Sequence, residues 1–184
     1  MSILNQIKHT KIKEIGKLNK NQLEHDRQNF LKFSQKSQRF EDALKKSCNN
    51  KYTLITEIKK ASPSKGIIRE DFNPKELAIS YEKGGASCLS VLTDVKYFQG
   101  CKEYITQIKE VVSTPLLRKE FMIDPLQVIE SKKLGADCIL IIIGMNSVDE
   151  NKMIESMALD IGLECILEVH SLEELEATKH FSSN

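Results

Sequence analysis

The sequence lacks the features that mark several classes of protein. No stretch of the 184 residues reaches the roughly 18 consecutive apolar residues that a membrane span requires, and the first residues lack the apolar run of a signal peptide. The 27 basic and 26 acidic side chains nearly cancel, so no overall field attracts nucleic acid or an anionic membrane. We therefore expect neither nucleic acid nor membrane among the partners of this chain.

The cysteines and histidines are too scattered for a disulfide framework or a zinc site. The five cysteines are odd in number and form no CxxC pair, and three of them lie inside apolar runs. The four histidines are also far apart in the sequence. We expect reduced, structural thiols in a cytosolic, cytoplasmic protein, with no metal.

The first fifty residues are highly charged and helical in character. Apolar residues from Ile3 to Leu18 fall roughly on one helical stripe. A polar stretch follows at 19–29, and apolar residues at 30–33 and 40–44 indicate a second helix that ends near Asn49 and Asn50. We interpret residues 1–50 as a helical extension ahead of the main fold.

From residue 51 onward, short apolar runs alternate with amphipathic segments of helical period. The runs lie at 52–58, 88–92, 115–117, 138–143 and 165–169. The candidate helices lie at about 74–84, 101–112, 125–134, 147–161 and 171–180. Repeated strand-then-helix units predict parallel strands joined by crossover helices. The run at 138–143 lacks alternation, as expected for a parallel strand that is buried on both faces.

Two α/β architectures fit this pattern, an open doubly wound sheet and a (β/α)8 (TIM) barrel. The nucleotide-binding motifs GxGxxG and GxxxxGK[ST] are absent, and polar residues follow the predicted strands instead. A barrel collects its active-site groups at these strand ends, so the pattern favours a barrel. A full barrel has eight strands and about 250 residues. We therefore expect residues 51–184 to be a partial barrel with strands 1–5, lacking the last three βα units.

Charged side chains at the strand ends are the candidate site. Glu57, Lys59, Lys119 and Glu168 would converge at one rim, where paired acids and bases can transfer protons and lysines can bind a carboxylate or phosphate. Ordinary solvated surface charge is the alternative for each of them. His170 has no partner histidine and fits a loop role, and the pair Thr93 and Asp94 fits a cap of the following segment.

These residues resemble the indole-3-glycerol-phosphate synthase family, a (β/α)8-barrel family of tryptophan, and hence aromatic amino acid, biosynthesis. The resemblance is carried by Glu57-Ile-Lys59-Lys-Ala-Ser62-Pro63-Ser64-Lys-Gly66, Ser90-Val-Leu-Thr93-Asp94, Tyr97-Phe98-Gln-Gly100, Pro115-Leu-Leu-Arg118-Lys119-Glu-Phe121 and Leu167-Glu168-Val169-His170. It covers essentially the whole chain.

The resemblance implies a lyase, a decarboxylase that uses neither metal nor organic cofactor. The reaction closes the ring of 1-(2-carboxyphenylamino)-1-deoxyribulose 5-phosphate and gives indole-3-glycerol phosphate, carbon dioxide and water. Lys119 would be the general acid and Glu168 the general base. Lys59 would pair with the anthranilate carboxylate, and Glu57 would orient these groups. The implied substrate contacts are Ser64 at the phosphate, Phe98 and Phe121 as apolar walls, and Arg118.

Other functions stay open at this point. Another phosphate-binding barrel, such as an enzyme similar to phosphoribosylanthranilate isomerase, would use a Cys and Asp pair and has no reason to carry Lys119 with Glu168. A catalytically inert partial barrel is a further alternative. The resemblance also suggests other enzymes of tryptophan biosynthesis as partners of this chain.

Overall fold

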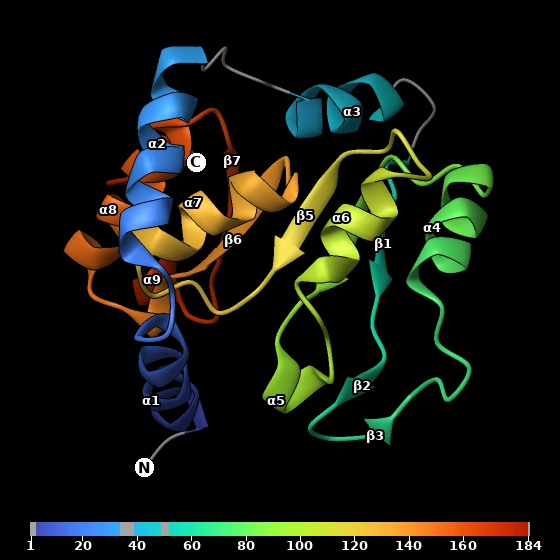
Figure 1. Cartoon of the computed structure of the whole chain (residues 1–184), viewed down its shortest axis with the longest axis horizontal. Coiled ribbons are helices and arrows are strands. Elements are labelled where there is room, and N and C mark those ends of the chain that lie inside the picture. Colours follow the sequence, from blue (N-terminus) through green and yellow to red (C-terminus); the bar gives the residue numbers. More distant parts are fainter. Residues whose placement is uncertain (1–2, 34–38, 49–51, 184) are drawn as a thin grey trace. The chain divides into compact units, whose positions relative to one another are not determined.

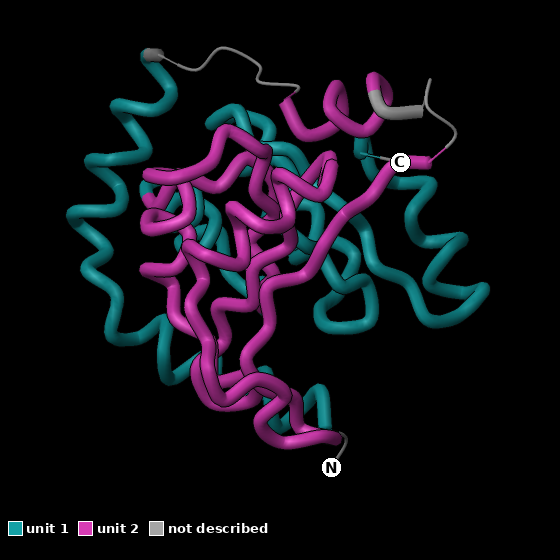
Figure 2. Tube along the Cα trace, turned by 90° about the vertical axis from the view of Figure 1, so that its right-hand side faces the viewer, with its two compact units in different colours: residues 1–37, 121–133, 139–184 teal, residues 38–120, 134–138 magenta. Residues whose placement is uncertain are grey.

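The computed structural model describes residues 3–33, 39–48 and 52–183, which fall into two compact units (Figure 2). Unit 1 comprises Met1–Ser37, Phe121–Lys133 and Ile139–Asn184, and unit 2 comprises Gln38–Glu120 and Leu134–Cys138. Both units therefore combine segments that are far apart in the sequence.

Unit 2 is built on three parallel strands in the order β1 (Ile55–Ile58), β4 (Cys88–Leu92) and β5 (Leu116–Lys119). The crossover helices are α4 (Pro74–Lys83) and α6 (Glu103–Lys109), labelled in Figure 1. Helix α4 begins at Pro74 after Asn73, whose side chain accepts hydrogen bonds from the backbone of Lys75 and Glu76. The strand-helix-strand pattern expected from the sequence is therefore present.

The core of unit 2 lies between the sheet and its helices. The residues of β4 are buried along the whole strand, which places apolar contacts on both of its faces. Residues of one cluster join the strands to α4 and α6; they include Ile58, Leu89, Val91, Leu116, Ala78, Ile105 and Ile108. Helix α3 (Arg39–Cys48) also belongs to this unit, and Phe40 of α3 is buried.

Unit 2 also contains short elements that the sequence pattern did not predict. After β1, the strands β2 (Ala61–Ser62) and β3 (Gly66–Ile67) form an antiparallel hairpin. After β4, Asp94 caps the short helix α5 (Val95–Phe98). These elements have only two to four residues, which is too few to show a hydrophobic period.

Unit 1 contains two neighbouring strands and most of the remaining helices. The strands are β6 (Cys138–Ile142) and β7 (Glu164–Glu168). The helices are α1 (Ile3–Ile15), α2 (Lys20–Phe33), α7 (Pro125–Leu134), η1 (Ile143–Met145), α8 (Val148–Asp160) and α9 (Leu172–Thr178). Ser147 and Glu150 form a capping box at the start of α8. The core joins the strands to α7 and α8 through Val128, Ile129, Ile139, Ile141, Ile154 and Ala158.

One expectation for the N-terminal part was wrong. The polar stretch at 19–29 does not separate two helices, because α2 runs through it. The side chain of Asn19 accepts a hydrogen bond from the backbone of Gln22, and Leu23 is buried in the core of unit 1. Pairs on the exposed face, such as Arg27 with Glu24, support this polar helix. The expected stop at Asn49 and Asn50 lies outside the described residues.

The five strand runs and five of the helices occur close to the predicted positions. None of the described helices combines the length and the apolar character needed to cross a membrane.

Candidate active site

Three charged side chains meet at the C-terminal end of the unit 2 sheet. Glu57 accepts a hydrogen bond from Lys59 through Oε1, and Nζ of Lys119 lies 3.6 Å from Oε2 of the same carboxylate. The side chains of Glu57, Lys59 and Lys119 are 31%, 32% and 35% exposed. One carboxylate therefore bridges two ammonium groups that solvent can reach.

Strand register explains why these residues meet. Glu57 is in register with Ser90, which is in register with Leu117 on β5. Residues in register share a face, and side chains two positions apart on a strand point to the same face. Lys119 therefore lies on the face of Leu117, and Lys59 follows Glu57 on the corresponding face. The expectation that Glu57 and Lys59 lie on one face is met.

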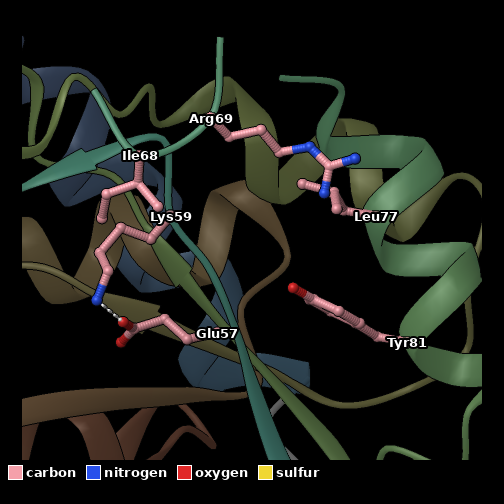
Figure 3. A pocket seen from close by; sticks show the side chains of 6 residues that line it. All are labelled: Glu57, Lys59, Ile68, Arg69, Leu77 and Tyr81. Atoms are coloured by element: carbon pink, nitrogen blue, oxygen red, sulfur yellow. Dashed lines mark hydrogen bonds and ion pairs between the residues drawn. The ribbon is translucent and has the colours of Figure 1, made fainter. Parts of the chain in front are cut away.

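A pocket of about 460 Å³ opens beside Glu57 and Lys59 (Figure 3). Its other lining residues are Ile68, Arg69, Leu77 and Tyr81. Figure 3 shows the Lys59–Glu57 ion pair on one side, with Arg69, Leu77 and Tyr81 on the other. Sequence reasoning missed these four residues. The spacing of Leu77 and Tyr81, four apart on α4, was the one local signal that they share a helix face.

The charges of this site suit an anionic ligand. Two lysines and one carboxylate leave a net positive charge at a partly exposed position. Arg69 adds a further cation to the wall of the pocket. An ammonium group that is hydrogen-bonded to a carboxylate can also donate a proton to a bound substrate. The geometry therefore suits both anion binding and proton transfer.

Arg118 lies next to Lys119 in sequence, but on the alternate face of the strand. It is buried, and its Nε donates a hydrogen bond to Oγ1 of Thr93 at 3.2 Å. Asp94 accepts hydrogen bonds from the backbone of Tyr97 and Phe98 and so caps α5. The capping interpretation therefore holds for Asp94, whereas the hydroxyl of Thr93 bonds elsewhere.

The two other candidate residues of unit 2 are on loops or short helices near the strand ends. Ser64 is exposed in the turn between β2 and β3. Phe98 is half-buried at the end of α5. The hairpin that carries Ser64 is closed by Ile68, whose backbone N–H donates to the carbonyl of Lys60 at 2.8 Å.

Glu168, His170 and Phe121 belong to unit 1, and the predicted convergence of Glu168 with Lys119 stays a prediction. Glu168 is the last residue of β7, and its Oε1 lies 3.0 Å from Nε2 of His170. The backbone N–H of His170 donates to Glu174 at 2.7 Å, in the loop before α9. Phe121 is half-buried, and its carbonyl accepts a hydrogen bond from Gln127. His170 therefore contacts a proposed catalytic carboxylate from an adjoining loop.

Cys101 and Cys165 are not activated nucleophiles. Burial, followed by the charge of Glu155, raises the pKa of Cys165 to about 12. Burial, with a smaller effect of the carboxylate of Glu103, raises the pKa of Cys101. Both thiols are therefore protonated near neutral pH, and the thiolate is the reactive form. The described residues also hold no group of three or more His, Cys, Asp or Glu side chains suited to a metal ion.

Solved structures support the fold class. The tryptophan synthase alpha chain from Legionella pneumophila subsp. pneumophila superposes with a TM-score of 0.54 at 14% identity, over 79% of this chain and 64% of that chain. The corresponding subunit from Legionella pneumophila str. Paris gives a TM-score of 0.51 at 13% identity, over 79% and 65%. Together with the five βα units, this likeness confirms a partial (β/α) barrel.

Sequence comparisons identify the family. The sequence model of the family "Indole-3-glycerol phosphate synthase" matches residues 4–184. The indole-3-glycerol phosphate synthase of Zymomonas mobilis subsp. pomaceae is 45% identical over 183 residues, which is 99% of this chain and 69% of that protein. The one from Azospirillum brasilense is 56% identical over 126 residues, which is 68% of this chain and 48% of that protein. The chain therefore belongs to the indole-3-glycerol phosphate synthase family, the carboxy-lyases of tryptophan biosynthesis, as the sequence motifs indicated.

Proposed function

We propose that this chain carries the lysine and carboxylate groups that convert 1-(2-carboxyphenylamino)-1-deoxyribulose 5-phosphate into indole-3-glycerol phosphate. The observation that supports this most directly is the bridging of Lys59 and Lys119 by Glu57 beside an open pocket. The family acts on a small phosphorylated substrate, and this substrate carries both a carboxylate and a phosphate. A site with a net positive charge fits both groups.

In this proposal, Lys119 is the general acid of ring closure. As the aromatic carbon attacks the ketone carbon, the carbonyl oxygen gains negative charge and takes a proton from the ammonium group of Lys119. Loss of carbon dioxide then leaves its bonding electrons in the new ring. In the later dehydration, Glu168 removes a proton from the intermediate, and an ammonium group of the site gives a proton to the hydroxyl, which leaves as water.

Glu57 and Lys59 prepare the site for this chemistry. Lys59 pairs with the substrate carboxylate, and because it already bonds to Glu57, it is held near its working position before the substrate arrives. Glu57 lies within ion-pair distance of Lys119 as well, so one carboxylate orients both cations.

Four substrate contacts complete the proposal. Ser64 would contact the phosphate, and Phe98 and Phe121 would form apolar walls for the aromatic ring. A contact of Arg118 with the substrate also remains a proposal, although this side chain is buried and bonded to Thr93. The absence of any cofactor is part of the proposal.

The alternatives differ in how they fit the family match. An enzyme similar to phosphoribosylanthranilate isomerase is not favoured, because the matching relatives are named as synthases over 126 to 183 residues. An inert partial barrel is an outcome of the experiment below. A cytosolic, cytoplasmic location and association with other enzymes of tryptophan biosynthesis also stay proposals. The four free cysteines among the described residues support the proposed cytosolic location.

The proposal is tested by following indole-3-glycerol phosphate fluorescence with the 184-residue chain and with a version extended by three βα units. Lys119→Ala and the control Lys75→Ala are made in the extended chain; Lys75 forms a surface ion pair with Glu110 on unit 2. We expect turnover in the extended chain, a loss of about 100-fold or more with Lys119→Ala, and little change with Lys75→Ala. A folded extended chain without turnover would favour the inert alternative.

A further inference from the structure

A single buried hydroxyl holds the end of β5 on which Lys119 lies. Thr93 follows β4 directly and is only 2% exposed. Its backbone N–H donates to the carbonyl of Lys119 at 3.1 Å, and its Oγ1 donates to Oε2 of Glu120 at 3.0 Å. The same Oγ1 accepts a hydrogen bond from Nε of Arg118 at 3.2 Å. Thr93 therefore bonds to three consecutive residues, with Lys119 in the middle.

The chemistry of these bonds requires a hydroxyl. Arg118 and Glu120 are 4% and 6% exposed, so both charges depend on partners inside the protein. A hydroxyl can donate its one proton to the carboxylate and still accept from the guanidinium through a lone pair. A methyl group of the same size can do neither. Thr93 is thus the link between a buried cation and a buried anion.

This network lies behind the strand that presents Lys119. Side chains alternate along a strand, so Arg118 and Glu120 point to the face opposite that of Lys119. Lys119 faces Glu57 instead, at 3.6 Å. The bonds to Thr93 therefore fix the backbone from one face, while the ammonium group of Lys119 lies on the other face, toward Glu57.

Thr93 is itself held by the loop that follows it. The backbone N–H of Gly100 donates to the carbonyl of Asp94 at 2.7 Å. A Cβ atom at position 100 would lie 2.4 Å from the carbonyl oxygen of Leu92, closer than real contacts allow. The loop thus returns tightly over the end of β4. Thr93 is anchored between the strand and this closed loop.

We propose that Thr93 is a positioning residue that sets the place of Lys119 against Glu57 through its bonds to Arg118, Lys119 and Glu120. The importance of that place for turnover rests on the proposed function. The position of Lys119 relative to Glu57 does not depend on the proposed function, and it can be measured without substrate.

The first test uses Thr93→Val, which removes the hydroxyl at nearly constant size, and Thr93→Ser, which retains it. Lysines of the 184-residue chain are reductively methylated with ¹³C-formaldehyde, and the signal of Lys119 is assigned by its loss in Lys119→Arg. We expect the Lys119 signal to keep its position in Thr93→Ser and to move toward those of exposed lysines in Thr93→Val.

The matched control is Thr114→Val. Thr114 is also buried, and its hydroxyl donates to the carboxylate of Glu82 at 2.6 Å. It lies before the N-terminal end of β5, however, whereas Lys119 lies at the C-terminal end. We expect Thr114→Val to lower stability without moving the Lys119 signal.

If Thr93→Val does not fold, Glu120→Gln replaces it. The amide of this variant still accepts a hydrogen bond from Thr93, but it no longer balances the charge of Arg118. A smaller shift in the same direction is then expected. An unmoved Lys119 signal in the folded variant would overturn the proposal.

Turnover separates this proposal from the proposed function. In the extended chain, we expect Thr93→Val to lower kcat by between about 10-fold and 100-fold with a much smaller change of KM, because a small misplacement of a catalytic group is costly. Thr93→Ser should restore most of the rate. If the extended wild-type chain shows no turnover, the proposed function fails, whereas the NMR signal of Lys119 still decides the role of Thr93.

Discussion

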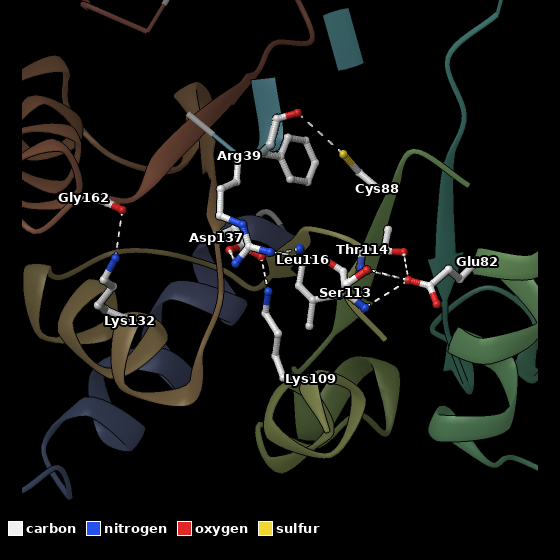
Figure 4. Close-up of polar contacts among 11 residues, drawn as sticks. Arg39, Glu82, Cys88, Lys109, Ser113, Thr114, Leu116, Lys132, Asp137 and Gly162 are labelled. Carbon is white, nitrogen blue, oxygen red and sulfur yellow. Dashed lines mark hydrogen bonds and ion pairs between the residues drawn. The ribbon is translucent and has the colours of Figure 1, made fainter. Parts of the chain in front are cut away.

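The two ends of the unit 2 sheet both carry buried or half-buried charges, but they use them differently. At the N-terminal end, Oε1 of Glu82 accepts hydrogen bonds from the backbone N–H groups of Ser113 and Thr114, both at 3.0 Å (Figure 4). The hydroxyls of the same two residues also donate to it, at 3.4 and 2.6 Å. This carboxylate is surrounded by fixed donors of the segment that leads into β5.

Asp137 has a similar place on the same side. Its Oδ2 accepts from the backbone of Leu116 at 2.8 Å and from Lys109, and Oδ1 lies 3.5 Å from Arg39 of α3 (Figure 4). The backbone N–H of Asp137 donates in turn to the carbonyl of Leu116. Helix α3 is fixed further where Arg39 donates to the carbonyl of Ser113 at 3.3 Å. The carboxylates at this end therefore accept hydrogen bonds from backbone N–H groups and hold neighbouring segments together.

At the C-terminal end, three of the charged side chains, Glu57, Lys59 and Lys119, bond to other side chains and stay partly exposed. Glu57 bonds to Lys59 and Lys119, and about a third of each side chain is exposed beside the pocket. A ligand can replace such partners at small cost, whereas backbone donors cannot move away. The difference follows the division known for barrels, in which the N-terminal end provides stability and the C-terminal end provides function.

Among single substitutions at the two ends of this sheet, Asp137→Ala is expected to change stability most. The change leaves Lys109 and the N–H of Leu116 without their carboxylate partner in a buried place. We expect a loss of about 3–5 kcal/mol in the free energy of unfolding, measured by urea denaturation. The Lys119 signal in the ¹³C-methyl spectrum should keep its position.

Asp137→Asn is the control for that experiment. The amide oxygen still accepts from Leu116, so a smaller loss is expected, roughly half that of the alanine variant if the charge and the hydrogen bonds matter equally. A loss below about 1 kcal/mol for Asp137→Ala would contradict a structural role for Asp137, because a loss of that size is expected of an exposed ion pair.

The next effect concerns the opposite end. Glu57→Gln keeps the shape of the side chain but removes the charge shared by Lys59 and Lys119. In the extended chain we expect turnover to fall by about 100-fold, equivalent to roughly 2.7 kcal/mol in the barrier. The free energy of unfolding should change by less than about 1 kcal/mol, because the pair is partly exposed. A large loss of stability with unchanged turnover would show that Glu57 is a structural residue like Asp137.

Much of the fold could be predicted because its signals are local. The apolar runs mark the strands, and Asn73-Pro74, Ser147 and Ser171 mark the starts of helices with side-chain caps that the structure contains. The helicity of 20–33 could not be predicted from apolar period, because polar pairs, the buried Leu23 and the partly buried Phe30 support it. The hairpin β2–β3 has strands too short for any period to appear.

The candidate site was predictable only in part, for a similar reason. Glu57 and Lys59 share a face through their spacing alone, but their approach to Lys119 depends on the order and register of β1, β4 and β5. The bonds of Thr93 to Arg118 and Glu120 depend on the same register across 25 to 27 residues. Arg69 and Tyr81 line the pocket only because the loop after the hairpin and α4 lie beside β1. No local pattern encodes such long-range placement.

The smallest expected effect depends on pH and concerns Glu82. Its hydrogen bonds, first of all from the hydroxyl of Thr114 and then from the backbone of Thr114 and Ser113, hold the pKa of Glu82 below its ordinary value of 4.5. A carboxylate with a lowered folded-state pKa stabilises the fold above its unfolded-state pKa, and this contribution is lost as the pH falls through the folded value. Replacing Glu82 with glutamine should therefore lower the free energy of unfolding at neutral pH and change it little in acid.

We expect Glu82→Gln to lower the free energy of unfolding by about 1–2 kcal/mol near neutral pH, since charge-assisted bonds are replaced by neutral ones. The difference from wild type should shrink below a pH of about 4.5, because the wild-type carboxyl then becomes protonated as well. Urea denaturation of both chains across this range measures the difference directly. The corresponding change Glu110→Gln, in a surface ion pair with Lys75, should show little effect at any pH. A constant difference between Glu82→Gln and wild type down to strongly acidic pH would mean that the shape of the side chain, and not its charge, holds the segment before β5.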